Sequence, residues 1–370
     1  MAQASVRRLV LRAGLLFAAG CVLLAVGVGI GVPYLDKTGL HPVTVVGLAV
    51  LAIGLVSVGI GGTTLVRATR SWRRVLVLPA LLAALVIALL SLGQAVAATN
   101  VPPTAVGATT PADRGLPFSE VRFATTDGLA LAGWYIPSRN GAAAVLLHGA
   151  GSTRSSVLEH AVVLARHGYG VLLFDARGHG RSEGRAMDFG WYGDQDVTAA
   201  VSFLQAQPAV NDELIAAVGL SMGGEEAIGA AAHDERIRAV VAEGATNRIS
   251  ADKAWLSDEF GWRGTVQEGL ERLTYGITDL LTAADQPIAL RDAVAAFAPR
   301  PVLLVAGGDR ADEGHASRYI QSASPATVDL WIVPGTGHTA ALDTHPAQWE
   351  HRVTAFLADA LHLDAQHGLR

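Results

Sequence analysis

The sequence has one cysteine and few charged residues. Cys21 is the single cysteine among 370 residues, so no disulfide can form within the chain and every folded part depends on its core. Only 16% of the residues are charged and 51% are hydrophobic, which is more apolar than an ordinary soluble protein. The net charge is −5 and the basic residues form no stripe, which argues against nucleic acid as a partner.

Charge is absent from three long apolar runs near the N-terminus. These runs cover residues 13–32, 43–66 and 75–98, and each reaches the ~20 residues that cross ~30 Å of hydrocarbon. We therefore expect a membrane domain over residues 1–98 with three transmembrane helices, the first of which ends at Pro33. Because no acidic or basic residue lies inside a run, an anchor is favoured over an ion or proton pathway.

The arginines predict the orientation of this membrane domain, since short cytoplasmic loops retain positive charge. The first connection carries only Asp36 and Lys37. Arginines precede the first run and fill the second connection: Arg7, Arg8, Arg12, Arg67, Arg70, Arg73 and Arg74. We expect a cytoplasmic N-terminus and, after three crossings, everything beyond Ala98 on the outer side.

One alternative is a cleaved signal peptide in place of the first helix, for which the run is too long. Another is cleavage after the small residues Ala95 and Ala97.

Residues 99–117 are rich in proline and threonine and predict a semi-extended linker. A globular domain over residues 118–370 follows. The turn Asp127-Gly128 between two alternating segments predicts an antiparallel hairpin at the edge of a sheet. Further buried strands are expected near residues 143–147, 171–174, 214–218, 238–242, 301–305 and 328–333. Apolar strands that alternate with helices indicate an α/β fold with a mostly parallel sheet covered on both faces.

The alternation of strands and helices stops over residues 247–299. Aromatic residues such as Trp255, Phe260, Trp262 and Tyr275 occur there among helical patches. One interpretation is a small helical cap over a site, whose tryptophans would form an apolar pocket. The other is a peripheral subdomain whose aromatic residues are its own core. Both interpretations fit the sequence equally well.

The pentapeptide Gly219-Leu220-Ser221-Met222-Gly223 lies between an apolar strand and a run of small residues. A serine in this place projects from a tight strand-to-helix turn, and the glycines two positions away let the flanking backbone approach. Because a Gly-rich chain contains such pentapeptides by chance, the alternative is an ordinary Gly/Ser turn. Two upstream motifs supply the context that decides: residues 146–151 are LLHGAG and residues 174–182 are FDARGHGRS.

With these three motifs in this order, the chain resembles the α/β-hydrolase superfamily over roughly residues 118–364, in its serine aminopeptidase-like and esterase/lipase branch. The resemblance implies an α/β-hydrolase fold and a serine hydrolase with Ser221 as the nucleophile. A serine needs a histidine that takes its proton and a carboxylate that holds the histidine. His338, in the loop after the strand at 328–333, matches the family's position for this base.

The acid of the triad is harder to assign than the base. In the family it follows the strand before the histidine, three residues beyond a glycine, and here that position is Arg310. Asp309 is our first choice, with Glu313, Asp312 and, at the end of an earlier strand, Glu243 as alternatives. Each of them could instead be a solvated loop carboxylate.

The resemblance also implies an oxyanion hole made of the backbone N–H groups of Met222 and Ala150, where negative charge develops on the former carbonyl oxygen. Gly149 and Gly151 leave that approach open. Glu225 follows Ser221 in the first helical turn, where the helix dipole explains a carboxylate. It could instead bind a positively charged group of a peptide substrate.

Together these motifs predict a membrane-anchored serine hydrolase that cleaves an ester, thioester or amide through an acyl-enzyme on Ser221, without a cofactor or a metal. Small-molecule or lipid-like esters are the favoured substrates, because the predicted anchor places the site near a lipid bilayer. One alternative is a serine aminopeptidase-like peptidase that acts on peptide substrates. An alternative of another class is a non-catalytic membrane interaction module on the same fold.

Overall fold

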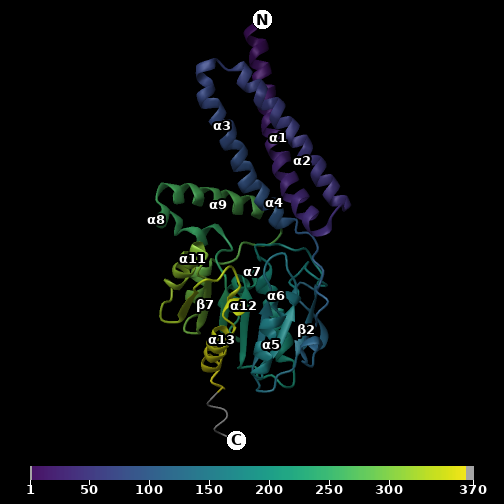
Figure 1. Ribbon diagram of the computed structural model, residues 1–370, viewed down its shortest axis with the longest axis vertical. Helices are drawn as coiled ribbons and strands as arrows, with labels where there is room; N and C mark the ends of the chain where they lie inside the picture. The colour runs from purple at the N-terminus through teal and green to yellow at the C-terminus, as the bar shows by residue number, and fades with distance from the viewer. Residues whose placement is uncertain (1, 364–370) are drawn as a thin grey trace. The chain divides into compact units, whose positions relative to one another are not determined.

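The computed structural model describes residues 2–363 (Figure 1). Their contacts form two compact units, of which the first contains the chain up to Pro102 together with Thr265–Ala283. The second contains Pro103–Gly264 and the chain from Ala284 onwards. The middle of the segment in which the sequence suggests a cap is therefore part of the first unit.

The first unit is helical. The helices are α1 (Ala2–Thr38), α2 (Pro42–Ala68), a 3₁₀ turn η1 (Ser71–Arg73), α3 (Arg74–Ile87), the π-helical segment η2 (Ala88–Gly93), α4 (Gln94–Thr99) and most of α9 (Trp262–Leu281). Three stretches, Val6–Thr38, Pro42–Ala68 and Ser71–Thr99, are long and apolar enough to cross a membrane. They coincide with the three charge-free runs of the sequence.

Helix α1 does not end at Pro33 as expected from the sequence, but continues to Thr38. A proline removes one intrahelical hydrogen bond and crowds the preceding turn. Because α1 packs closely against α2, this single loss does not end the helix. Glycines make the close packing possible: a side chain at Gly27 would meet the backbone of Leu51, and one at Gly47 would meet the backbone of Gly31. Such small residues are typical of helix contacts in lipid.

The second unit is built on a sheet of eight strands in the order β1-β2-β4-β3-β5-β6-β7-β8. The strands are β1 (Ser119–Ala124), β2 (Ala130–Ile136), β3 (Ala143–Leu147), β4 (Gly170–Phe174), β5 (Ile215–Leu220), β6 (Ile237–Glu243), β7 (Val302–Gly307) and β8 (Val328–Val333). The hairpin β1–β2 and the pair β2–β4 are antiparallel, and all other pairs are parallel. This is the mostly parallel sheet with an antiparallel edge that the sequence predicts.

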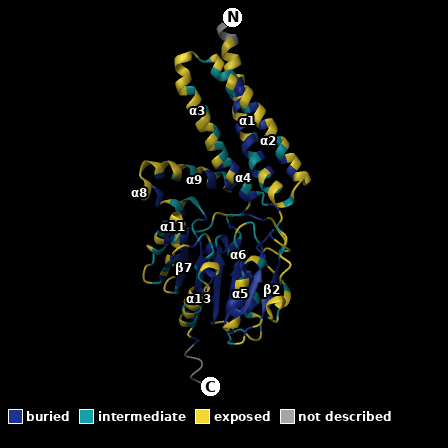
Figure 2. Ribbon diagram, in the orientation of Figure 1, coloured by how far each residue is buried: buried dark blue, intermediate teal, exposed yellow. Residues whose placement is uncertain are grey.

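Helices cover both faces of this sheet. They are α5 (Leu158–Arg166), α6 (Gly193–Gln205), α7 (Met222–His233), α8 (Leu256–Phe260), α10 (Leu290–Phe297), α11 (Ala311–Gln321), α12 (Ala341–Thr344) and α13 (Pro346–Ala360), with short 3₁₀ turns η3 (Pro111–Arg114), η4 (Arg154–Val157) and η5 (Ser250–Lys253). Successive residues of β3 pack in different hydrophobic clusters. Leu146 packs in a cluster with α5 and α13, and Val145 packs in another cluster with α6, α7 and α10. Strands β3, β4, β5 and β7 are accordingly buried on both sides (Figure 2), which explains their continuous apolar runs.

The parallel strands carry the candidate residues to one edge of the sheet. Ser221 follows the last residue of β5, His148 follows β3, and His338 lies in the loop after β8. Since the carboxyl ends of parallel strands meet at the same edge, loops far apart in the sequence converge there.

Candidate active site

Ser221 occupies a strained turn between β5 and α7. Its backbone has φ 54° and ψ −123°, a conformation that a residue with a side chain rarely adopts and that clusters at functional sites. The turn depends on its glycines: a side chain at Gly219 would strike the carbonyl of Gly223, and one at Gly223 would strike the backbone of His148. The pentapeptide is therefore the protruding elbow that the sequence predicts, not an ordinary surface turn.

His338 lies against this serine. Its Nε2 is 2.9 Å from Oγ of Ser221, and its Nδ1 is 2.6 Å from Oε1 of Glu313. The carboxylate can only accept a hydrogen bond, so Nδ1–H donates to it and Nε2 is left to accept from the serine hydroxyl. The structure thus brings together the predicted nucleophile, the predicted base and one of the predicted alternative acids.

The acid in contact with His338 is Glu313 rather than Asp309, which corrects our first choice. Asp309 is exposed in the turn between β7 and α11, where its N–H donates to the carbonyl of Thr336 at 3.1 Å. Glu313 starts from the first turn of α11 and folds back over the end of β7, where the N–H of Gly307 donates to its Oε2 at 2.9 Å. The longer side chain reaches the histidine from the helix, while Asp309 lies outside on the loop.

The other two acids considered from the sequence have different surroundings. Asp312 is exposed, 3.7 Å from the guanidinium of Arg310. Glu243 is buried, and its two oxygens accept hydrogen bonds from the N–H of Ala341 at 2.8 Å and from Nε1 of Trp349 at 2.9 Å. Glu243 therefore holds the segment after His338 instead of contacting His338. Trp349 was not recognised in the sequence, where nothing distinguishes it from any core tryptophan.

The electrostatics of the site favour proton transfer from the serine. The hydrogen bond to Glu313 raises the pKa of the His338 imidazole, and the charge of the same carboxylate adds to the effect. A more basic imidazole is a better acceptor for the hydroxyl proton, and the adjacent carboxylate stabilises the imidazolium that results.

The resemblance assigns an oxyanion hole to the backbone N–H groups of Met222 and Ala150, and both residues lie on segments next to Ser221. Met222 begins α7, and the first N–H groups of a helix have no acceptor within it. Ala150 belongs to the loop after β3, which passes so close that a Cβ at Gly149 would lie 3.3 Å from Cβ of Ser221. Both N–H groups can therefore serve an oxygen that carries negative charge.

His148 fixes the loop that contains Ala150. Burial lowers the pKa of His148 to about 3, so its ring is neutral near pH 7. Nε2 then accepts from the N–H of Ala176 at 3.0 Å, and Nδ1–H donates to the carbonyl of Gly149 at 2.8 Å. Through these contacts His148 has a structural role in the loop.

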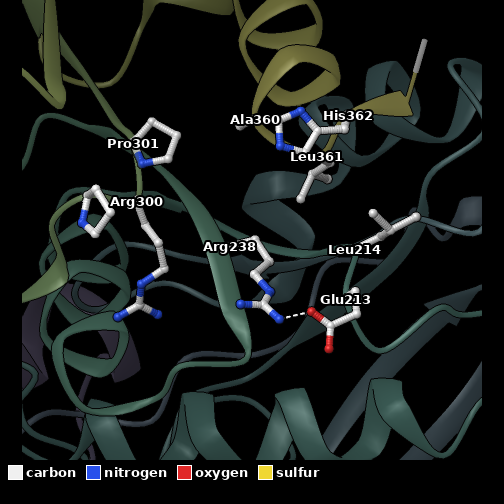
Figure 3. Close-up of a pocket in the computed structure, with 9 residues that line it drawn as sticks. Glu213, Leu214, Arg238, Arg300, Pro301, Ala360, Leu361 and His362 are labelled. Atoms are coloured by element: carbon white, nitrogen blue, oxygen red, sulfur yellow. Dashed lines mark ion pairs between the residues drawn. The ribbon is translucent and has the colours of Figure 1, made fainter. Parts of the chain in front are cut away.

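A cavity of about 450 Å³ lies away from this site, at the amino ends of β5, β6 and β7 (Figure 3). Its cationic side chains are already engaged. Arg238 forms an ion pair with Glu213, and Arg300 donates to the carbonyls of Ala231, Asp234 and Ile237. The cavity contains none of the nucleophile, base or acid residues, so we place the candidate site at the carboxyl edge of the sheet.

A parallel sheet with a serine elbow, a histidine and a glutamate at its carboxyl edge has the architecture of an α/β hydrolase. Residues 144–352, which are more than half of the chain, match the model of the Alpha/beta hydrolase family. The chain belongs to that family.

Curated relatives include a thiohydrolase and a polyketide transferase. Thiohydrolase aneE of Aspergillus aculeatus is 41% identical over 128 residues, and polyketide transferase grgF of a Penicillium species is 36% identical over 138 residues. Each match covers 34% of this chain, and the chain spans 40% and 45% of the length of these two relatives. The uncharacterized protein YfhR of Escherichia coli K12 is 26% identical over 65% of this chain and 81% of its own length.

Solved structures share the fold. The esterase Pf2001 of Pyrococcus furiosus aligns with 70% of this chain and 99% of its own, at a TM-score of 0.54 and 26% identity. The α/β hydrolase GrgF of a Penicillium species aligns with 67% of this chain and 100% of its own, at a TM-score of 0.53. Its sequence identity of 22% supports the common fold alone.

Proposed function

We propose that the protein is a membrane-anchored serine hydrolase that cleaves carboxylic esters or thioesters through an acyl-enzyme on Ser221. The observation that carries the proposal is the continuous hydrogen-bonded chain from Oγ of Ser221 through the imidazole of His338 to Glu313. A serine, a base and an orienting acid in this order are the arrangement that activates a hydroxyl for attack on a carbonyl.

In this mechanism Oγ of Ser221 attacks the carbonyl carbon of the substrate while Nε2 of His338 takes the hydroxyl proton. The carbonyl π pair moves to oxygen, and the N–H groups of Met222 and Ala150 donate to the oxyanion. When the intermediate collapses, the bond to the leaving group breaks and His338 delivers its proton to the departing oxygen or sulfur. Water then attacks the acyl-enzyme with the same histidine as base, which releases the acid and regenerates Ser221.

The surroundings of Glu225 bear on the choice between an ester and a peptide. Oε1 of this buried carboxylate accepts from the N–H of Thr246 and the N–H of Asn247, each at 2.9 Å. The carboxylate that the peptidase alternative assigns to a substrate amine is thus buried, and one of its oxygens is bound by the loop after β6. Together with the similarity to a thiohydrolase and an esterase, this favours oxygen and sulfur esters over amides.

The three apolar helices support the anchoring part of the proposal. Their length and composition suit a bilayer, and the arginines before α1 and between α2 and α3 favour a cytoplasmic N-terminus. With three crossings, the hydrolase unit lies on the outer side of the membrane.

Labelling with a fluorophosphonate probe tests the mechanism in the full chain. The wild type should be labelled, and Ser221→Ala should lose all labelling. Ser152→Ala is the matched control, because Ser152 lies in the neighbouring loop with its hydroxyl bonded to Ser156; it should label as the wild type does. A folded wild type that resists the probe would contradict a serine nucleophile.

Two further measurements test the substrate and the sidedness. Turnover of p-nitrophenyl esters and acyl thioesters should exceed that of aminoacyl-nitroanilides, whereas a preference for the anilides would support the peptidase. In intact cells a membrane-impermeant fluorophosphonate should label Ser221, and protection from it until the cells are opened would place the site on the cytoplasmic side.

A further inference from the structure

Helix α9 exposes its apolar face. At about 100° per residue, the side chains of Trp262, Val266, Leu273 and Leu280 fall within about 40° of one another on the helix surface. They are exposed by 73%, 56%, 43% and 84%. Figure 2 shows such exposed residues along α9. We call these four side chains the stripe of α9. A helix that packs on a protein in water normally directs such an apolar stripe inward.

Over residues 274–278 the opposite face of α9 is buried although it is polar. Thr274, Tyr275 and Thr278 are each almost inaccessible. The two threonine hydroxyls donate to the helix itself, Thr274 to the carbonyl of Leu270 and Thr278 to the carbonyl of Thr274, both at 2.9 Å. The helix is therefore amphipathic in the reverse sense, with its polar side satisfied inside the protein and its apolar side outside.

Most of α9 belongs to the first unit and contacts its third apolar stretch. Residues 265–283 belong to that unit, and Oγ of Ser91 donates to the carbonyl of Leu270 at 3.5 Å. Around Ser91 the third stretch also exposes apolar side chains, Leu82 by 62% and Leu90 by 52%. Helix α9 thus shares its unit with a stretch that also exposes apolar side chains to its surroundings.

The position of Ser91 places α9 near one end of the third stretch. Thr99 ends that stretch, so Ser91 lies about 12 Å from the end, measured along the helix at about 1.5 Å per residue. Helices that lie in a membrane interface bury their apolar face ~5–10 Å into the boundary between headgroups and acyl chains. The guanidinium of Arg263 lies over the ring of Trp262 at 5.6 Å, a pair with an apolar body and a charged end, which suits this boundary.

We infer that α9 is an interfacial membrane helix whose stripe of Trp262, Val266, Leu273 and Leu280 contacts the acyl chains of the leaflet next to the hydrolase unit. The inference rests on the proposed membrane anchoring and adds a second attachment to it. The segment between β6 and β7 lies against the bilayer, in addition to the three N-terminal helices. The occupant of the stripe is lipid rather than a second copy of the chain, because α9 contacts the third candidate span and exposes apolar side chains as that span does.

Spin-label accessibility in phospholipid vesicles tests this assignment. The native cysteine is first replaced, Cys21→Ala, and nitroxides are attached in the full chain at Leu273→Cys or Leu280→Cys. Gln267→Cys is the control on the same helix, exposed but on its polar side, and Leu82→Cys reports on the third stretch. Oxygen concentrates in lipid and a nickel chelate stays in water, so the ratio of the two accessibilities identifies the surroundings of each label.

The labels at positions 273 and 280 should be severalfold more accessible to oxygen than to the nickel chelate, and so should the label at position 82. The label at position 267 should be more accessible to the nickel chelate than to oxygen. If the labels at positions 273 and 280 have the same accessibility ratio as the label at 267 while the label at 82 is in lipid, the inference fails and the anchoring stands. If 82 is also in water, the anchoring fails and the inference with it. Spin–spin broadening at 273 that disappears on dilution with unlabelled chain would show a second copy on the stripe and would overturn the assignment to lipid.

Discussion

Oε1 of Glu313 lies 2.6 Å from Nδ1 of His338, although the glutamate belongs to the first turn of α11 and the histidine to the loop after β8. The second oxygen, Oε2, accepts from the N–H of Gly307 at the end of β7. One buried carboxylate therefore connects two neighbouring strand ends, and its position is fixed by the backbone as well as by the imidazole.

Glu313→Gln should reduce kcat for an ester substrate on the order of 10³- to 10⁴-fold, because the amide cannot stabilise the imidazolium or hold the required tautomer. Asp309→Asn is the matched control, since this exposed carboxylate lies in the turn just before α11 and has no contact to His338 in the described structure; it should turn over at nearly the wild-type rate. Steady-state kinetics with both variants measure the difference. A large loss in Asp309→Asn with little effect of Glu313→Gln would restore Asp309 as the acid.

The dependence of kcat/KM on pH should show an acid limb that belongs to His338. Glu313 raises the pKa of this imidazole, and only the neutral ring can accept the serine proton. Activity is therefore fully present above the pKa and is lost as the pH falls through it. In Glu313→Gln the limb should move to lower pH, because the group that raises the pKa is gone. An acid limb that stays at the same pH in Glu313→Gln would mean that the limb reports the titration of a group other than His338.

The sequence predicted the sheet and led to Ser221 and His338, which lie in contact, because those features depend on local patterns. Apolar runs give the strands, and Gly219 and Gly223 mark the elbow at Ser221. The sequence could not show which carboxylate contacts His338, because that contact depends on how far a side chain reaches in three dimensions. Asp309 and Glu313 are four residues apart at the end of the same strand, and only the path of the chain into α11 brings the longer one to His338.

Glu243 should act as a positioning residue through the segment that follows His338. In Glu243→Gln the amide donor faces one of the two buried donors, Ala341 N–H or Trp349 Nε1–H, which costs about 1–3 kcal/mol of unfolding free energy and loosens the base. The thermal unfolding temperature and kcat should both fall. The double variant with Trp349→Phe removes one donor, so its destabilisation should be smaller than the sum of the two single changes. A Glu243→Gln variant that is destabilised but has an unchanged kcat would show that Glu243 contributes to stability and does not position His338.

Gly244 should be required for the position of His338. Its φ is +71°, and a Cβ there would lie 2.8 Å from Cε1 of the imidazole. Gly244→Ala should therefore strain the backbone by about 1–2 kcal/mol and displace the ring, and a displacement of about 1 Å costs on the order of 10²-fold in kcat.

Gly335→Ala separates these two effects. Gly335 lies three residues before His338 with a similar φ of +63°, but a Cβ there would meet nothing within 4 Å. This variant should lose stability to a similar extent and keep its kcat, measured well below its unfolding temperature. Equal losses of kcat in the two variants would trace the effect to backbone strain in general. A loss confined to Gly244→Ala would show that the narrow space beside the imidazole keeps His338 within reach of Ser221.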